Sequence, residues 1–277
     1  MSSVFRNCAV TVLLVCGVRS TWAADRRILR VCADPNNLPF SSQNTPGLEN
    51  RLASMIATEL GTKVEYSWWS ERKSFLKNSL NSGKCDAVMG VPSGLDTVAV
   101  TRPYYRSSYV TVTRRDSGTA VHSLFDDSLE NKRIGVHVAG DDFAPPAVVL
   151  ARRGLSSNIV GFSLFGADGE ANPAFRLLEA LARKEIDIAV VWGPFGGYFA
   201  KAKSKDMDVS PVSPSSYFGI PFTYDISVGV RKSDRALRDE IDRVIERKRD
   251  QIRVLLDEYG IPLVGESSAL GEKASTP

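Results

Sequence analysis

The sequence predicts an α/β fold of two lobes, each built on a doubly wound and mostly parallel sheet. A short unit occurs twice, at residues 80–92 and 181–194, where the end of a helical pattern leads through an Asp into a brief apolar run and a Pro. Such a run is typical of a strand covered on both faces, as parallel strands are. Strand and helix patterns alternate around both units, as they do in a doubly wound sheet. Together these observations predict two lobes of similar build with a crevice between them.

The first lobe is predicted from residues 24–116 together with a returning segment, residues 223–265. Leu48, Leu52 and Ile56 recur at helical spacing, and Gly61 follows as a helix end. The predicted strands are residues 28–33, 63–68, 87–91 and 109–113, and the predicted helices are residues 48–60 and 71–83.

The second lobe is predicted at residues 117–222, with the crossing from the first lobe at residues 117–119. A helix led by residues 140–142 tolerates Pro145 and Pro146 because both fall in its first turn. The other expected elements are strands at residues 134–138, 159–162, 187–191 and 209–212 and a helix at residues 173–184.

The end of the chain is predicted to return to the first lobe. Residues 225–230 form a strand pattern, and a long helical pattern at residues 234–259 stops at Gly260 and Pro262. Residues 266–277 are small and polar, so we expect a disordered tail.

The composition is that of a water-soluble globular protein large enough for two ordinary domains. Its 277 residues are 43% hydrophobic and 24% charged, and the formal net charge is only +3. Such a balance argues against nucleic acid as a partner.

Residues 1–23 are typical of a cleaved secretory signal. Arg6 precedes an apolar run at residues 8–18 that is too short to span a bilayer, and cleavage is expected after Ala23. The alternative is a buried N-terminal helix or a retained anchor. No later stretch approaches 18 apolar residues, so we expect an exported, soluble protein with no membrane span in the mature chain.

Removal of the signal leaves two of the four cysteines, Cys32 and Cys85. An exported protein with two cysteines is expected to join them in a disulfide, and the two lie at strands that can be parallel neighbours. The alternative is two free, buried thiols. Metal binding is weakly supported, because His122 and His137 are the only histidines and no close cysteine pair occurs.

Four segments in order resemble a known family. They are residues 29–41, the helix start at 48–50, residues 85–92 and residues 101–110. The chain resembles the type II periplasmic solute-binding proteins over residues 28–262. It is most similar to the J proteins of methanol-oxidation gene clusters, which are encoded beside quinoprotein alcohol dehydrogenases. The resemblance implies the two-lobe periplasmic-binding-protein type II fold, with its crevice at the carboxyl ends of the strands.

Two positions depart from the amino-acid binders of that fold. Those proteins hold the ligand carboxylate with an Arg and the amino group with an Asp, and here Gly94 and Gly193 take these positions. An amino acid is therefore an unexpected ligand.

The resemblance and the positions of the strand ends give a set of expected cleft residues. Asp34 ends the first strand and is a candidate ligand contact, or alternatively a turn-former bonded to its own backbone. The aromatic residues are candidates for a pocket wall or a partner anchor, or alternatively for core packing. The full set is Asp34, Asn36, Phe40, Trp69, Pro92, Ser93, Trp192 and Phe195.

The expected function is that of an accessory protein, not an enzyme. The resemblance implies that the protein assists a pyrroloquinoline-quinone (PQQ) methanol dehydrogenase in the periplasm, by contact and without a cofactor of its own. The alternative is a solute-binding subunit of an ABC importer for a small ligand other than an amino acid. No nucleophile elbow or Gly-rich phosphate loop occurs, so the sequence offers no clear catalytic site.

Overall fold

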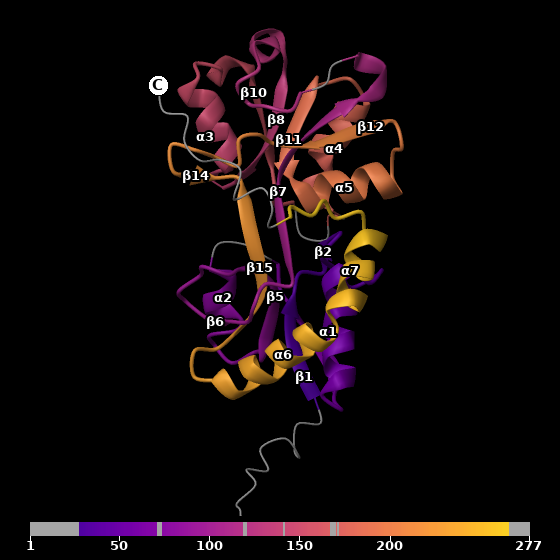
Figure 1. The fold of residues 1–277 in the computed structure, drawn as a ribbon, viewed down its shortest axis with the longest axis vertical. Helices are drawn as coiled ribbons and strands as arrows, with labels where there is room; N and C mark the ends of the chain where they lie inside the picture. Colours follow the sequence, from indigo (N-terminus) through magenta and orange to yellow (C-terminus); the bar gives the residue numbers. More distant parts are fainter. Residues whose placement is uncertain are drawn as a thin grey trace, which may run out of the picture.

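The computed structural model describes residues 28–70, 74–118, 121–140, 142–166, 170 and 172–265. Figure 1 shows two α/β lobes, one above the other, joined by two long strands that run between them. The predicted fold is confirmed. The expected signal and tail, residues 1–23 and 266–277, lie outside the described residues.

Lobe 1 contains a sheet in the order β4 (Lys63–Trp68), β1 (Ile28–Ala33), β5 (Ala87–Pro92) and β15 (Thr223–Val230). The strand β1 is parallel to both β4 and β5, and β15 is antiparallel to β5. One face packs against α1 (Leu48–Glu59), α6 (Arg235–Arg247) and α7 (Arg249–Glu258), and α2 (Phe75–Asn78) contributes to a smaller cluster around the cysteines.

Lobe 2 repeats this arrangement with β10 (Ile159–Ser163), β8 (Ile134–Ala139), β11 (Ile188–Trp192), β7 (Tyr105–Arg114) and β12 (Met207–Pro211). The strand β8 is parallel to β10 and β11, whereas β7 is antiparallel to β11 and β12. The helices are α3 (Pro145–Arg152), α4 (Arg176–Ala182) and α5 (Gly193–Ala202). The remaining short strands are β2 (Asn36–Asn37), β3 (Ser41–Ser42), β6 (Ala99–Val100), β9 (Asp142–Phe143), β13 (Ser216–Tyr217) and β14 (Ile220–Pro221).

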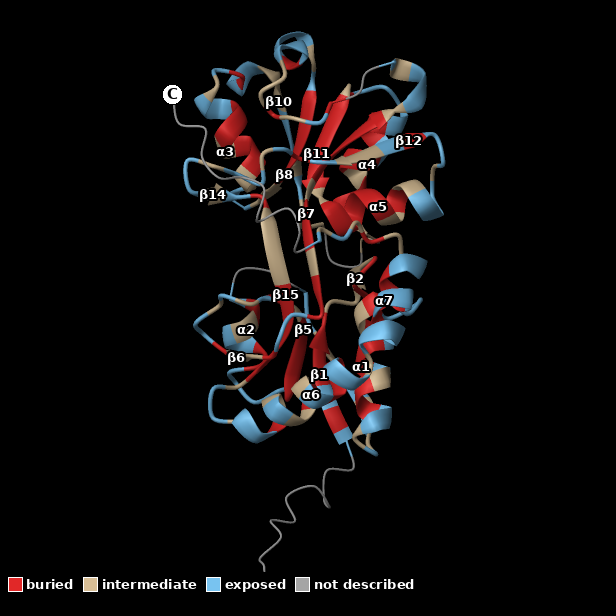
Figure 2. Ribbon diagram, viewed as in Figure 1, coloured by how far each residue is buried: buried red, intermediate tan, exposed pale blue. Residues whose placement is uncertain are grey.

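The strands β7 and β15 connect the lobes. Residues 105–108 of β7 pair with β15, and from Tyr109 onward β7 pairs with β11. The chain thus passes between the lobes within β7, whereas the sequence placed the crossing at residues 117–119. In Figure 2 β15 is buried inside lobe 1 and less buried between the lobes. The first three residues of β15 are half-buried, and Ile226 to Val230 are buried.

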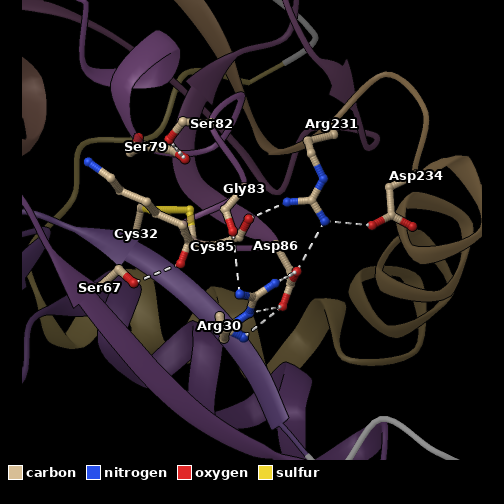
Figure 3. Close-up of polar contacts among 11 residues, drawn as sticks. Arg30, Cys32, Ser67, Ser79, Ser82, Gly83, Cys85, Asp86, Arg231 and Asp234 are labelled. Carbon is tan, nitrogen blue, oxygen red and sulfur yellow. Dashed lines mark hydrogen bonds and ion pairs between the residues drawn. A yellow bond between two sulfur atoms is a disulfide. The ribbon is translucent and has the colours of Figure 1, made fainter.

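The repeated sequence unit has the same structural role in each lobe. In lobe 1 the Asp86 carboxylate accepts hydrogen bonds from the backbone N–H of Arg30 at 3.2 Å and from its Nη2 at 2.8 Å (Figure 3). In lobe 2 Asp187 accepts from the backbone N–H of Arg133 at 2.8 Å and from its Nη2 at 3.0 Å. Each Asp therefore ties the start of one central strand to the strand beside it.

In each lobe the turn before the Asp also accepts a hydrogen bond from the Arg that bonds the Asp. Arg30 donates to the carbonyl of Gly83, and Arg133 donates to the carbonyl of Lys184. Both acceptors have a left-handed backbone, with φ of 79° and 64°. Gly adopts this conformation freely, whereas Lys is held in it at some cost.

The predicted disulfide is confirmed. Cys32 and Cys85 are bonded, with their Cα atoms 5.5 Å apart (Figure 3). The bond lies between β1 and the start of β5, where Cys32 is the register partner of Val88. It therefore joins the same two strands that Arg30 and Asp86 join.

Several predicted helices differ in extent. The long helix at residues 234–259 is two helices, α6 and α7, separated at Lys248. The helix expected at residues 71–83 covers only Phe75–Asn78 among the described residues. Asp142 belongs to the short strand β9 and does not open a helix. No helix in the described ranges is both long enough and apolar enough to cross a bilayer.

Candidate functional site

A cavity of about 410 Å³ lies between the lobes, where the carboxyl ends of β1, β5 and β11 meet. This is the position at which open α/β sheets commonly bind ligands. The side of lobe 1 contributes Asp34, Asn36, Asn37, Phe40, Glu49, Ser70, Met89, Gly90, Tyr105 and Ile226. The side of lobe 2 contributes Leu164, Phe165, Gly166, Glu170, Pro173, Ala174, Trp192 and Phe195.

Five of the eight predicted cleft residues line this cavity: Asp34, Asn36, Phe40, Trp192 and Phe195. Asp34 also forms a turn, because its Oδ1 accepts a hydrogen bond from the backbone N–H of Asn36 at 2.7 Å. The two interpretations of Asp34 are therefore compatible: the turn holds its carboxylate at the cavity wall.

The other three predicted residues lie outside the lining of this cavity. The Trp69 ring is 41% exposed, and the Lys84 ammonium lies 3.7 Å from its centroid. Pro92 is exposed at the end of β5. Ser93 is turned toward β15, where its Oγ lies 2.7 Å from the Oγ of Ser227.

Aromatic rings form the wall on the side of lobe 2. Trp192 makes edge contacts with Tyr109 at 5.6 Å and Tyr224 at 5.7 Å between ring centroids. Phe195 meets the rings of Phe40 at 5.2 Å and His137 at 5.5 Å. The wall is thus continuous with the packed interior of lobe 2, which fixes its shape.

His137 supports this wall as a neutral side chain. Burial lowers its pKa to about 4, which outweighs the opposite effect of its hydrogen bond to the Ala174 carbonyl. That bond is 2.9 Å long, and Nε2 must be the donor because a carbonyl oxygen only accepts. His137 therefore fixes Ala174, itself a lining residue, instead of offering a free base to the cavity.

Two acidic residues of the lining, Glu49 and Glu170, were not predicted. Glu49 lies in the first turn of α1, and its Oε1 lies against Gly90. A Cβ added to Gly90 would lie 2.1 Å from that oxygen, and the φ of Gly90 is +72°. A Gly in the middle of a strand often marks the close approach of another group, so Gly90 was the sequence signal that could have located Glu49. Glu170 forms an ion pair with Arg176, whose Nε lies 3.4 Å from the Glu170 Oε1.

The two glycines expected from the sequence at the anchor positions, Gly94 and Gly193, differ in the room they offer for a side chain. A Cβ added to Gly193 would lie 2.6 Å from the Ser108 carbonyl oxygen and 2.8 Å from the Ser107 Oγ. A Cβ at Gly94 meets nothing within 4 Å. A side chain at position 193 would therefore meet the backbone of β7, whereas a side chain at position 94 would not.

We expect Gly193→Asp to destabilise the protein by about 1–3 kcal/mol, because the new side chain must displace β7. Gly94→Arg should leave stability nearly unchanged, since space is open there. Thermal unfolding of the two variants measures both effects. Equal, small changes in the two would show that β7 yields easily, and amino-acid binding by Gly193→Asp in calorimetry would contradict the lack of room at position 193.

Metal binding finds no support in the described part of the chain. No group of three or more His, Cys, Asp or Glu residues there is arranged to hold an ion.

Comparison with known proteins agrees with this architecture. A model of the bacterial extracellular solute-binding proteins, family 3, matches residues 29–260. Protein MoxJ of Methylorubrum extorquens is 30% identical over 258 residues, which are 88% of this chain and 84% of MoxJ.

Two solved structures are similar over nearly the whole fold. MxaJ from Methlophaga aminisulfidivorans MPT has a TM-score of 0.72 and 25% identity, covering 85% of this chain and 100% of MxaJ. The periplasmic binding protein XoxJ from Methylobacterium extorquens AM1 has a TM-score of 0.69 and 32% identity, covering 86% of this chain and 100% of XoxJ. The resemblance to the J proteins is thus confirmed, and the chain belongs to the bacterial extracellular solute-binding proteins, family 3.

Proposed function

We propose that this protein is a periplasmic accessory protein of a PQQ-dependent methanol dehydrogenase and assists its maturation or activation by direct contact. The relatives MoxJ, MxaJ and XoxJ support the link to methanol oxidation. The observation that carries the contact role is the lack of room for a side chain at Gly193, which is the expected position of an amino-group anchor.

The aromatic wall of the cleft suits an apolar side chain of a partner protein. The rings of Phe165, Trp192 and Phe195 offer apolar surface, and shaped aromatic pockets are common anchoring points at protein interfaces. A protein that retains the crevice but lacks both ionic anchors can use the opening to hold a segment of the dehydrogenase.

The test is recovery of the dehydrogenase from periplasmic extract by the tagged mature chain. We expect Phe165→Ala, at the half-buried cavity wall, to reduce recovery severalfold. Phe218→Ala, at a hairpin tip that is 76% exposed and outside the cavity lining, is the matched control and should retain recovery. Failure to recover any quinoprotein dehydrogenase, with normal methanol oxidation in a deletion strain, would refute the proposal.

A second candidate is the solute-binding subunit of an ABC importer for a small ligand other than an amino acid. The cavity volume favours it, because about 410 Å³ lies within the usual range for small-molecule sites. Calorimetry against a panel of uncharged metabolites separates the two functions. Micromolar binding of a metabolite that leaves dehydrogenase recovery unchanged would favour import.

A further inference from the structure

We propose that the loop at residues 34–43 is an intramolecular latch that holds the two lobes closed over the cavity without a ligand. The loop belongs to lobe 1, since it follows β1 and leads to α1. Two of its residues, Leu38 and Phe40, contact lobe 2 directly. Solute-binding folds commonly close around a bound ligand that bridges their lobes, so a latch of this kind would supply that bridge from the chain itself.

The first contact is a hydrogen bond between the lobes. The backbone N–H of Leu38 donates to Oδ1 of Asn172 at 3.1 Å. Asn172 has a left-handed backbone with φ of 52° and precedes a 3-10 helix at Pro173–Phe175. Asn is among the few residues that adopt this conformation readily, so the carboxamide is presented to Leu38 at little cost.

The second contact is apolar. Phe40 is only 9% exposed and belongs to the hydrophobic cluster of lobe 2, together with Phe175, Phe195 and Phe199. Its ring meets Phe195 edge to face, and Leu38 packs against the same cluster. Separating the lobes would expose to water both Phe40 and the apolar side chains that surround it in lobe 2. The free-energy cost of that exposure opposes opening.

The loop is rigid enough to transmit this contact. The N–H of Phe40 donates to the Asn37 carbonyl at 2.9 Å, and the N–H of Gln43 donates to the Pro35 carbonyl at 2.9 Å. The first turn of α1 is bonded to it as well, because the N–H groups of Leu48 and Glu49 donate to the carbonyls of Pro39 and Phe40 at 2.8 Å. The segment that carries Leu38 and Phe40 is therefore held firmly to lobe 1.

A second tie lies at the C-terminal end of α7, where the chain passes below α5 (Figure 1). Tyr259 of lobe 1 stacks on Tyr198 of α5 at 6.0 Å between ring centroids. The Lys201 ammonium donates to the Asp257 carbonyl at 2.6 Å. Because these contacts also join the lobes, release of the latch is expected to widen the cavity without separating the lobes completely.

Small-angle X-ray scattering and hydrogen exchange of the mature, ligand-free protein test the latch. The scattering of the wild type should match the profile calculated from this structure, in which Leu38 and Phe40 contact lobe 2. Phe40→Ala combined with Asn172→Gly should increase the radius of gyration. Asn172→Gly alone should accelerate exchange of the Leu38 N–H about fivefold, since it removes one hydrogen bond. Asn172→Asp keeps an acceptor at the same position and should restore slow exchange.

Phe143→Ala is the matched control, because Phe143 is 62% exposed on β9 and outside the apolar cluster that holds Phe40. Circular dichroism establishes that each variant is folded. An unchanged radius of gyration in the folded double variant would overturn the proposal, as would an open wild type. Neither measurement depends on the dehydrogenase, so failure of the latch leaves the proposed function standing.

Discussion

Replacing Cys32 and Cys85 with Ser is expected to lower the free energy of unfolding by about 4 kcal/mol, the loss that chain entropy predicts for a loop of this length. The bond spans a sequence separation of 53 and joins two strands of the central sheet of lobe 1. Both cysteines are buried, so each hydroxyl of the double variant also faces an apolar cluster that includes Phe75, Leu80 and Val88. The variant should unfold at a markedly lower denaturant concentration than the wild type.

Denaturant unfolding of the oxidised wild type, the reduced wild type and the double variant measures this effect. The reduced wild type should lose nearly as much stability as the variant, because both lack the cross-link. Peptide mapping under non-reducing conditions gives the independent check. Two free thiols in fully folded material would contradict the strand order of lobe 1.

Asp86→Ala is expected to cost about 3 kcal/mol, because it removes a largely buried carboxylate whose hydrogen bonds are shared by two partly exposed arginines. The Asp86 side chain is 11% exposed and bonds both Arg30, at 2.8 Å, and Arg231, at 3.1 Å (Figure 3). Arg231 directly follows β15, so the carboxylate connects the first and last strands of lobe 1. Asp187→Ala is the natural control: Asp187 is 29% exposed and bonds Arg133, so it should cost about 1 kcal/mol.

The effect of Asp86 should also depend on pH in a defined direction. Burial raises its pKa, but hydrogen bonds from Arg30 and Arg231 outweigh burial, so the pKa lies below the usual value of 3.8. The unfolded chain therefore binds the proton more readily than the folded chain does. The stabilisation is complete above about pH 5 and is lost as pH falls through the lowered pKa. The stability difference between wild type and Asp86→Ala should shrink in acid, and a constant difference down to pH 2 would contradict this pairing.

The elements that the sequence predicted well are those in which one pattern dominates. The apolar strands β1, β5 and β8 and the helix α1 have nearly the predicted bounds. The helix α5 was missed because Gly193, Pro194, Gly196 and Gly197 resemble a loop. In the structure these glycines permit close packing: a Cβ on Gly197 would lie 2.0 Å from the Gly260 carbonyl oxygen. Local propensity carries no information about such long-range contacts.

The cleft was predicted only in part, because long-range contacts also decide which side chains reach it. Asp34 and Trp192 directly follow or end a strand, and both line the cavity, as the rule of carboxyl strand ends predicts for their position. Glu49 lies on a helix, and its position depends on how the start of α1 is bonded to the loop before it. Ser93 follows β5 as the rule requires, but a hydrogen bond to the Asp225 carbonyl at 2.9 Å turns it toward β15. Tertiary hydrogen bonds of this kind decide which strand-end residues face the cavity.

The position of β15 has a consequence for how the molecule folds as the chain emerges with its N-terminal part first. This strand lies between β5 and β7, yet it is made after all of lobe 2, as are the covering helices α6 and α7. A nascent chain that ends before Thr223 therefore carries β5 with an open hydrogen-bonding edge, and such edges pair with other chains. Residues 105–222 contain the strands of the lobe 2 sheet and can form it first. The lobe that emerges first is thus completed last, and the unfinished intermediate is the species that a chaperone would have to protect.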